Sequence, residues 1–385
     1  MKLNTVVWII NIISSIWFPI GVSKLIYYMP KDKLIHAEFQ IFKKSETPFQ
    51  WVKKEIELSL NPGEVLVRII LTTICGSDLH TIEGKRKEDV PCILGHEGVG
   101  EIIALNNREG FELGDRVTWT IADSCGKCPA CAEYGLPEKC TELFKYGHAS
   151  LTIGSGLNGC YSTIIHIRKG THLVKIPDLV GNSMAAPANC ALATIVNAVS
   201  QIKKSTKKVV VQGGGLLGIY GCALLKEMGV EEIYCLEVNL DRFKTIEKFG
   251  AIPVDAGDIP RATSYILDRL EEGADVVFEV AGVKELIPQG LKLLRPGGEY
   301  ILVGLVHPDS ELGITAEQII RKCITIKGVH NYGPWHLEEA VKFLDRNREK
   351  YPFDELVGPP FKLKELGEAV REAKKQNWFR VSVKP

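Results

Sequence analysis

The sequence predicts an α/β protein that combines a β-rich unit with a doubly wound parallel sheet. Between about Leu34 and Arg116, short β-branched and apolar runs are separated by Gly, Pro and Asn turns, which is typical of a barrel-like β unit. From about Leu192 to Gly328, apolar strands alternate with helical stretches, which is typical of parallel βαβ units. A glycine motif after the first of these strands favours the same fold class.

Individual elements follow from the same patterns. The β-rich unit is expected to contain strands at Glu64–Thr73 and Gly98–Ala104. The alternating region predicts, in chain order, strands and helices at Lys208–Gln212, Leu216–Glu227, Ile233–Glu237, Asp241–Phe249, Ala274–Val280 and Glu299–Val303, with a turn at Arg295–Gly298. After Gly328, a helix at Leu337–Arg346 and a strand at Phe379–Val383 are expected to pack back on the first unit. The predicted division is a leader at 1–30, a β-rich domain at 31–191 and 329–385, and a parallel-sheet domain at 192–328.

Composition indicates a globular protein and excludes one class of partner. The 385 residues are 45% hydrophobic and 24% charged, which is enough apolar sequence for a large core. Forty-seven basic and forty-seven acidic residues cancel, so no global positive field would attract nucleic acid. The eleven cysteines are odd in number and partly clustered, which favours the reducing cytoplasm over a disulfide framework.

A glycine-rich turn predicts a dinucleotide site. Gly213, Gly215 and Gly218 fill the glycine positions of G-x-G-x-x-G between a predicted strand and a predicted helix. The first allows a tight turn, the second lets the backbone approach a pyrophosphate, and the third lets helix pack on strand. The helix amino terminus at Leu216 and Leu217 would then hold the anion.

The next predicted strand indicates which dinucleotide is bound. Glu237 ends that strand, where an acid accepts hydrogen bonds from the adenosine ribose. Its carboxylate would repel a 2′-phosphate, which favours NAD. Arg242 lies nearby and leaves NADP open as the alternative.

Four cysteines predict a structural metal site. Cys125, Cys128, Cys131 and Cys140 form C-x2-C-x2-C-x8-C in a loop that contains Gly and Pro. Four thiolates close a tetrahedral shell around zinc and leave no open position for a substrate. The alternative is that they are four unrelated cytosolic thiols.

A second metal site is expected in the β-rich unit. Cys75, in Cys-Gly-Ser-Asp-Leu-His, and His96, in Gly-His-Glu, offer a thiolate and an imidazole. Singly, each has a structural explanation, as a buried thiol and a turn histidine. Together with a dinucleotide site they favour a catalytic metal, because an alkoxide must form beside the nicotinamide before hydride leaves its carbon.

With these motifs in order, the chain from about Lys33 to its end resembles the medium-chain, zinc-containing alcohol dehydrogenase family. The resemblance is carried by Cys75-x-x-Asp78-x-His80, Gly95-His96-Glu97-x-x-Gly100, Gly114-Asp115-Arg116-Val117, the four-cysteine loop and the glycine motif. It implies a GroES-like catalytic domain, a Rossmann domain and an active site between them. The last gap of the cysteine loop has eight residues where the family pattern has seven.

The family resemblance also implies residue roles. Cys75 and His96 match ligands of the catalytic zinc, and Cys190 in Asn189-Cys190-Ala191 matches the third. Glu97 resembles the carboxylate near the metal, Asp78 the partner that orients a ligand histidine, and Ser77 and His80 the two ends of a proton relay. Arg380 resembles a residue of the carboxy-terminal tail that contacts the cofactor. The implied cofactors are two zinc ions per chain and NAD, and the implied assembly is a homodimer or homotetramer.

The substrate is expected to be a small alcohol or its carbonyl product. A finer resemblance, carried by segments such as Gly84-Lys85-Arg86-Lys87 and Leu143-Phe-Lys-Tyr-Gly-His148, is to phosphonate-catabolism-associated alcohol dehydrogenases. A phosphonate needs cations, and Lys85, Arg86, Lys145 and His148 are candidates, although surface charges of this kind are usually solvated. A polyol or amino-alcohol dehydrogenase is the alternative within the family, and a noncatalytic nucleotide sensor is the alternative from another class.

The mostly apolar segment Leu3–Met29 has three interpretations. It is long enough for a membrane anchor, because ~20 apolar residues cross a bilayer. A signal peptide is less suitable, because no small-residue cleavage site stands out and export would suit neither thiolate ligands nor a nicotinamide cofactor. Translation could also start at Met29, so that residues 1–28 are absent from the native protein. A cytoplasmic location is expected, with a membrane-tethered enzyme facing the cytoplasm as the alternative.

Overall fold

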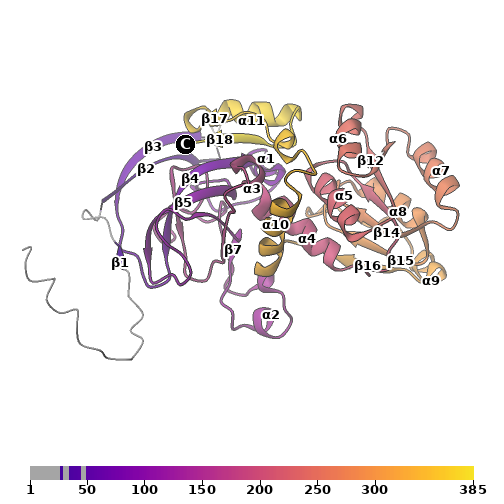
Figure 1. Cartoon of the computed structure of the whole chain (residues 1–385), viewed down its shortest axis with the longest axis horizontal. Coiled ribbons are helices and arrows are strands. Elements are labelled where there is room, and N and C mark those ends of the chain that lie inside the picture. The colour runs from indigo at the N-terminus through magenta and orange to yellow at the C-terminus, as the bar shows by residue number, and fades with distance from the viewer. Residues whose placement is uncertain (1–26, 29–33, 45–48) are drawn as a thin grey trace, which may run out of the picture.

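The computed structural model describes residues 27–28, 34–44 and 49–385. Apart from Tyr27 and Tyr28, the apolar segment Leu3–Met29 lies outside the described residues. Its three interpretations therefore stay open. Among the described residues, no helix combines the length and the apolar character that crossing a bilayer requires. Figure 1 shows two lobes side by side, each built around its own sheet.

The first lobe contains an eight-stranded sheet that is antiparallel except at one edge. Its main path runs β10 (Leu173–Lys175), β6 (Arg116–Trp119), β5 (Glu97–Asn106), β4 (Val65–Ile74), β18 (Val381–Lys384) and β17 (Phe361–Lys362), with β1 (Tyr27–Tyr28) beside β5 and β9 (Ile164–Ile167) beside β4. Two further hairpins pair β2 (Leu34–Phe42) with β3 (Phe49–Glu57), and β7 (Ala122–Asp123) with β8 (Phe144–Lys145). Strand β4 is buried along most of its length, as its nearly continuous Val, Leu and Ile sequence predicts.

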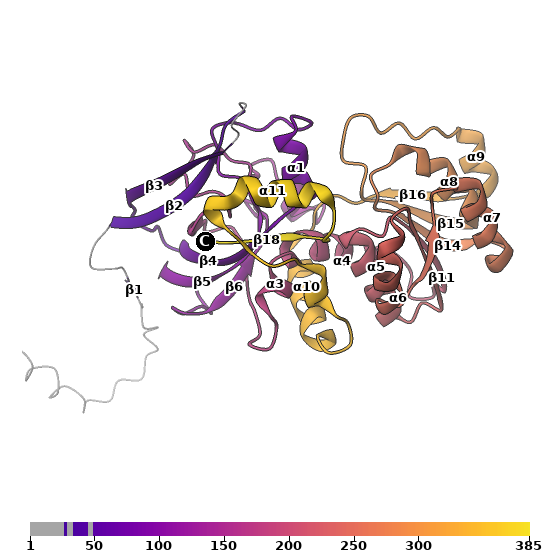
Figure 2. The ribbon, with the colours of Figure 1, turned by 90° about the horizontal axis from the view of Figure 1, so that it is seen from above.

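The carboxy-terminal tail returns to the first lobe, as expected. Strand β18 pairs antiparallel with β4, with Val381 opposite Ile74. Helix α11 (Leu366–Lys375) packs on the same sheet, and Figure 2 shows α11 and β18 beside the strands of the first lobe. This return places residue 380 next to the end of β4, where the candidate site begins.

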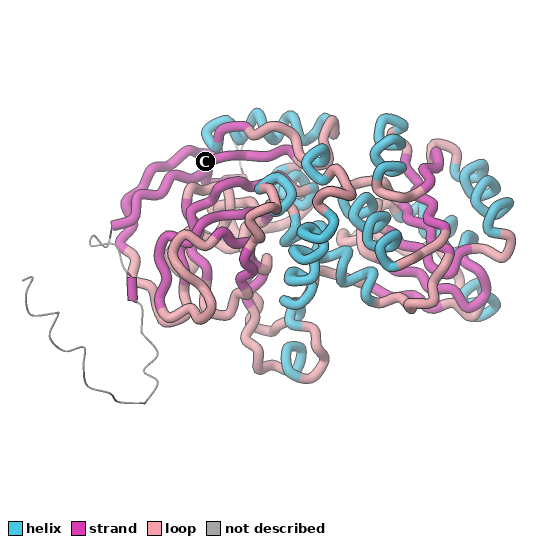
Figure 3. The backbone as a smooth tube through the Cα atoms, viewed as in Figure 1, coloured by secondary structure: helices cyan, strands magenta, loops and turns pink. Residues whose placement is uncertain are grey.

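The second lobe is a six-stranded parallel sheet. Its order is β13 (Ile252–Asp255), β12 (Glu232–Glu237), β11 (Lys208–Gln212), β14 (Ala274–Glu279), β15 (Leu294–Leu302) and β16 (Thr325–Gly328). The direction of winding reverses between β11 and β14, which is the point at which doubly wound sheets bind ligands. Helices cover both faces: Val209 and Val211 pack with α5 (Leu216–Met228), whereas Val210 packs with α7 (Ile259–Leu270) and α8 (Ile287–Leu293). Figure 3 shows these helices around the strands.

The remaining helices are short or connect the lobes. They are α1 (Gly76–Ile82), α2 (Pro129–Ala132), α3 (Asn182–Ala185), α4 (Ala193–Ser200), α6 (Phe243–Lys248), α9 (Ala316–Lys322) and α10 (Pro334–Asn347), with a π turn, η2 (Ala188–Leu192), and 3-10 turns η1 (Pro137–Lys139), η3 (Leu240–Arg242), η4 (Lys284–Leu286), η5 (Phe353–Leu356) and η6 (Leu363–Glu365). The largest hydrophobic cluster includes Leu71 and Val99 of the first lobe and Val209 of the second, so a continuous core joins the two sheets.

Most predicted elements are present, and two differ. The expected helix at Asp241–Phe249 is divided into η3 and α6. The expected turn at Arg295–Gly298 is a bulge inside β15, because Ala274 pairs with Leu294 whereas Val276 pairs with Glu299. Gly297 has φ +71° there, a conformation that glycine tolerates, so the strand can continue through the irregularity. The domain boundaries at 191 and 328 stay predictions.

Candidate active site

Cys75 and His96 are brought together by the pairing of β4 with β5. Cys75 follows β4 and caps α1, and Asp78 at the third position of that helix accepts a hydrogen bond from the Cys75 backbone N–H at 2.9 Å. Gly95 lies just before β5 with φ +86°, and a Cβ atom there would approach the Tyr161 ring to 2.7 Å. The glycine therefore allows the turn that carries His96.

Asp78 also orients the imidazole. Its Oδ1 lies 3.4 Å from His96 Nδ1, and its Oδ2 accepts a hydrogen bond from the Tyr161 hydroxyl at 3.1 Å. The other ring nitrogen, Nε2, is left for the interior of the site. This is the arrangement in which a carboxylate holds a metal-ligating histidine in one tautomer.

Cys190 reaches the same place from the linker between the lobes. It lies in the π turn η2, and π turns inside helices are frequent at functional sites. The preceding Asn189 is fully buried, and its Nδ2 donates to the His96 and Trp119 carbonyl oxygens, both at 2.9 Å. Asn189 thereby ties the turn that carries Cys190 to the strands that carry His96.

The resulting donor set fits a zinc ion. One ligand atom each from Cys75, His96, Glu97 and Cys190 lies within 4.8 Å of the others. The Cys75 and Cys190 sulfur atoms are 3.9 Å apart, and two thiolates bound 2.3 Å from one tetrahedral ion would be about 3.8 Å apart. The neighbouring Cys190 thiol lowers the pKa of Cys75 well below its ordinary value, which favours the thiolate that metals bind.

Glu97 is held by the carboxy-terminal tail. The Arg380 guanidinium donates to the Glu97 carboxylate through Nε (3.1 and 2.9 Å) and Nη2 (2.9 Å), and both side chains are buried. Thr73, opposite Glu97 in the sheet, donates to Oε2 at 2.5 Å. Burial raises the pKa of Glu97 to about 7, against the opposing charge of Arg380. The Arg380 guanidinium also lies 3.6 Å from the Cys75 sulfur. Arg380 therefore contacts two of the four side chains in the donor set, Glu97 and Cys75.

Ser77 and His80 both lie on α1. The Ser77 hydroxyl is 3.4 Å from His96 Nε2, so it borders the donor set. His80 is exposed, three residues further along the helix, and side chains three residues apart share a helix face. The structure therefore places the two proposed relay residues at the inner and outer ends of one short helix, and the relay itself stays a proposal.

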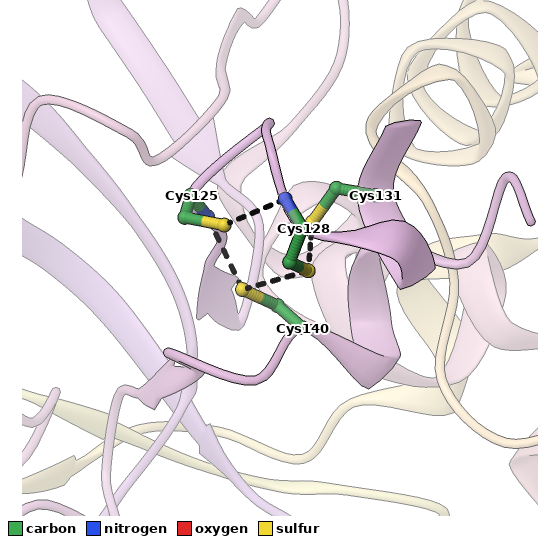
Figure 4. A group of neighbouring side chains, drawn as sticks. All are labelled: Cys125, Cys128, Cys131 and Cys140. Atoms are coloured by element: carbon green, nitrogen blue, oxygen red, sulfur yellow. Dashed lines mark hydrogen bonds between the residues drawn. The ribbon is translucent and has the colours of Figure 1, made fainter. Parts of the chain in front are cut away.

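The four loop cysteines form a second donor set, as predicted. Cys125, Cys128, Cys131 and Cys140 bring one sulfur each within 4.8 Å of the others, and Figure 4 shows them pointing toward a common centre. The Cys128 sulfur is 3.5 Å from that of Cys131 and 4.0 Å from that of Cys140. The gap before Cys140 contains η1, and Cys140 directly follows this 3-10 turn. Closed shells of this kind are structural.

A cavity of about 600 Å³ extends from the glycine turn to residues next to the donor set, namely Gly76, which follows Cys75, and Arg380, which contacts the Cys75 sulfur. Its walls include Gly213 and Gly215 after β11, Val280 and Ala281 after β14, and Arg380. Gly213 has φ +112°, and a Cβ atom on Gly218 would lie 1.9 Å from the Gly213 carbonyl oxygen. Both glycines are therefore sterically required, and the amino terminus of α5 at Leu216 and Leu217 opens at the winding reversal.

Glu237 lines the same cavity at the end of β12. Its Oε1 accepts from the Val238 and Asn239 backbone N–H groups, both at 2.9 Å, and its Oε2 pairs with Arg242 at 3.2 Å. Arg242 is further held over the Phe379 ring, 5.1 Å from its centroid. Its charge is thus already engaged by Glu237, which makes it a poor receptor for a second phosphate.

The four candidate cations differ in environment. Lys85 is largely exposed and pairs with Glu83 at 2.9 Å. His148 is stacked on His96 and hydrogen-bonded to Glu88 at 2.8 Å, and burial lowers its pKa to about 4, so it carries no charge. Arg86 lies 3.4 Å from the same Glu88, whereas Lys145 is partly buried in β8. Among the described residues, Lys145 is the one of the four that has no carboxylate within ion-pair distance.

Sequence reasoning missed Thr73, Tyr161 and the pairing of Arg380 with Glu97. The register of β4 with β5 would have indicated Thr73. No local signal indicates Tyr161, because its contact with Asp78 spans 83 residues.

Comparison with known families gives two matches. Residues 61–178 match the alcohol dehydrogenase GroES-like domain family, and residues 217–346 match the zinc-binding dehydrogenase family. A sorbitol dehydrogenase of Halalkalibacterium halodurans is 30% identical over 87% of this chain and 95% of its own. An L-threonine 3-dehydrogenase of Photorhabdus laumondii is 29% identical over 73% of this chain and 80% of its own.

Solved structures agree. An alcohol dehydrogenase of Thermotoga maritima is similar with a TM-score of 0.85 and 28% identity, over 91% of this chain and all of the other. A zinc-binding dehydrogenase of Sinorhizobium meliloti solved with NADP has a TM-score of 0.79 and 21% identity, over 91% of this chain and all of the other, and it shows the fold alone. The predicted fold class, a GroES-like domain with a Rossmann domain, is confirmed.

Proposed function

Because this chain belongs to the medium-chain, zinc-containing alcohol dehydrogenase family, and is therefore a zinc enzyme that works with a nicotinamide dinucleotide, we propose that it transfers hydride between a small alcohol and NAD. The observation that carries this proposal is that Cys75, His96 and Cys190 meet next to Gly76 and Arg380, which line the cavity that also contains the glycine turn. A metal site next to a dinucleotide cavity is what alcohol oxidation needs.

Each proposed residue has a defined task. Cys75, His96 and Cys190 would hold a catalytic zinc, which supplies a Lewis acid that lowers the pKa of an alcohol. Ser77 would accept the hydroxyl proton beside the donor set while giving up its own proton toward exposed His80, which would release a proton to solvent. Glu97 stays next to the zinc ligands because Arg380 and Thr73 hold both of its oxygens.

The second lobe positions the cofactor. The dinucleotide provides the hydride acceptor. The amino terminus of α5 would hold its pyrophosphate, Gly213 and Gly218 keep the turn tight enough for that approach, and Glu237 would accept hydrogen bonds from the adenosine ribose. Glu237 and the engaged Arg242 favour NAD over NADP. The four-cysteine loop would hold the second, structural zinc.

The narrower substrate is proposed to be a hydroxyalkylphosphonate, on the finer resemblance of the motifs around Arg86 and Lys145. A polyol or an amino alcohol is the alternative, and it is supported by the activities in the names of the sorbitol and threonine dehydrogenases. We also propose a cytoplasmic homodimer or homotetramer.

The test is NAD reduction over primary alcohols, secondary alcohols, polyols, amino alcohols and hydroxyalkylphosphonates, followed by NADH absorbance, with zinc measured on the same sample. About two zinc ions per chain and turnover with some alcohols are expected. Replacement of Cys190 by Ala should abolish turnover and lower the zinc content. Full zinc and tight NAD binding without turnover on any alcohol or aldehyde would instead favour the noncatalytic sensor.

A further inference from the structure

We propose that Glu279 is a positioning residue for the cofactor, because its buried carboxylate fixes the backbone of residues 280–283 so that one wall of the NAD cavity is formed before NAD binds. The segment 280–283 is called the wall turn below. The inference rests on the proposed function for the identity of the dinucleotide, and it assigns the residue that holds the wall of its cavity in place.

Glu279 is a buried acid that the proposed chemistry does not use. It is the last residue of β14, the strand that borders the point where the direction of winding reverses. Its side chain is fully buried, and a buried carboxylate is unfavourable unless its oxygens accept hydrogen bonds. The fold must therefore supply donors to both oxygens.

Backbone N–H groups from two segments are these donors. The Gly282 N–H, in the wall turn, donates to Oε1 at 2.6 Å, and the Gly304 N–H, shortly after β15, donates to Oε2 at 3.2 Å. Burial raises the pKa of Glu279, and hydrogen bonds from the surrounding backbone oppose that rise. One carboxylate thereby links the wall turn to the end of the neighbouring strand.

The wall turn and the chain after β15 approach each other too closely for side chains. A Cβ atom on Gly304 would lie 2.5 Å from the Gly282 nitrogen, and a Cβ atom on Gly282, where φ is +73°, would lie 3.0 Å from the Gly304 carbonyl oxygen. The Gly304 N–H also donates to the Glu279 carbonyl oxygen at 3.1 Å. The two glycines therefore let both segments reach the same carboxylate.

The wall turn borders the cofactor cavity and packs on the glycine turn. Val280, Ala281 and Val283 line the cavity of about 600 Å³. A Cβ atom on Gly213 would lie 2.9 Å from the Ala281 Cα atom, so the wall turn contacts the turn that would hold the pyrophosphate. If Glu279 no longer held the wall turn, NAD would have to order this segment when it binds, and that ordering lowers affinity.

NADH binding tests the proposal without turnover. Glu279→Gln keeps the size of the side chain but replaces one oxygen with an NH2 group, which cannot accept a hydrogen bond. Either the Gly282 N–H or the Gly304 N–H then loses its acceptor. The Kd for NADH, measured by isothermal titration on the zinc-loaded enzyme, should rise about tenfold or more. The kcat at saturating NAD and the zinc content should stay close to the wild-type values, because Glu279 does not touch the reacting atoms.

Asp275→Asn is the matched control on the same strand. Asp275 lies near the opposite end of β14, and its Oδ2 also accepts from two backbone N–H groups, those of Lys207 at 2.8 Å and Lys208 at 3.0 Å. Both substitutions should lower the free energy of unfolding, but Asp275→Asn should leave the Kd for NADH unchanged. A wild-type Kd in Glu279→Gln, or an equal loss of NADH affinity in both variants, would overturn the positioning role.

Hydrogen exchange in the wild-type enzyme is a second test, and it does not require a variant that folds. The Gly282 amide should be protected from exchange before NAD is added, because Glu279 already accepts its hydrogen bond and protected amides report local order. A Gly282 amide that exchanges freely in the NAD-free enzyme, and is protected only after NAD is added, would contradict a wall formed in advance.

The two proposals fail separately. NADH binding that depends on Glu279 in an enzyme that oxidises no alcohol would leave the positioning role intact and overturn the dehydrogenase function. Alcohol oxidation by an enzyme whose NADH affinity is the same in Glu279→Gln as in the wild type would do the reverse.

Discussion

Arg380→Met is expected to destabilise the first lobe strongly. The substitution keeps an unbranched apolar stem and removes three contacts of 2.9 to 3.1 Å to the Glu97 carboxylate. Glu97 is fully buried, and it would be left with Thr73 as its hydrogen-bond donor. Breaking one side of a buried ion pair costs about 3–5 kcal/mol of unfolding free energy, because the remaining carboxyl group must either stay charged without a partner or take up a proton.

Urea unfolding at fixed zinc concentration, followed by near-ultraviolet circular dichroism and tryptophan fluorescence, measures this cost, and coincident transitions justify the linear extrapolation. Arg371→Met on α11 is the control, because Arg371 is exposed and its single ion pair, with Glu368, is long at 3.8 Å. This substitution should leave the free energy of unfolding unchanged. The double variant Arg380→Met with Glu97→Gln should lose less than the two single variants together. A stability for Arg380→Met within about 1 kcal/mol of the wild type would refute the reasoning.

Three further outcomes are expected. Asn189→Ala removes two buried hydrogen bonds to the carbonyls of His96 and Trp119. It should cost about 1–3 kcal/mol of unfolding free energy and weaken zinc binding in a competition with a chelator. Unchanged zinc affinity would contradict the role given to Asn189. Cys131→Ser should halve the zinc content and lower the melting temperature while leaving the catalytic donor set complete, so a variant with full zinc content would disprove a four-thiolate site. Glu237→Ala should raise KM for NAD about tenfold, equivalent to about 1.4 kcal/mol, and should narrow the preference for NAD over NADP. An unchanged ratio of the KM values for NAD and NADP would show that Glu237 does not contact the ribose.

Local patterns determined the elements that depend on nearby residues. The glycine turn is encoded within six residues, because its steric requirements come from neighbouring residues. A Cβ atom on Gly218, for example, would lie 1.9 Å from the Gly213 carbonyl oxygen. The four-cysteine loop is equally local, and its spacing predicted the second donor set. The sequence predicts a turn at Arg295–Gly298 where the structure has a bulge, because glycine and proline are typical of both and only the pairing with β14 distinguishes them.

By itself, the sequence determined the fold class, the cofactor turn and the loop metal set, since short-range sterics and hydrophobic periodicity act between residues that are close along the chain. Only the tertiary structure decided which distant groups meet. Cys75 and Cys190 are 115 residues apart, and Arg380 is 283 residues from Glu97. Their contacts arise because the tail strand β18 pairs with β4 and the π turn is tied to β5. The partner of a buried charge or of a metal ligand depends on distance in space and on desolvation. The tertiary fold determines both, and the spacing of residues along the chain does not.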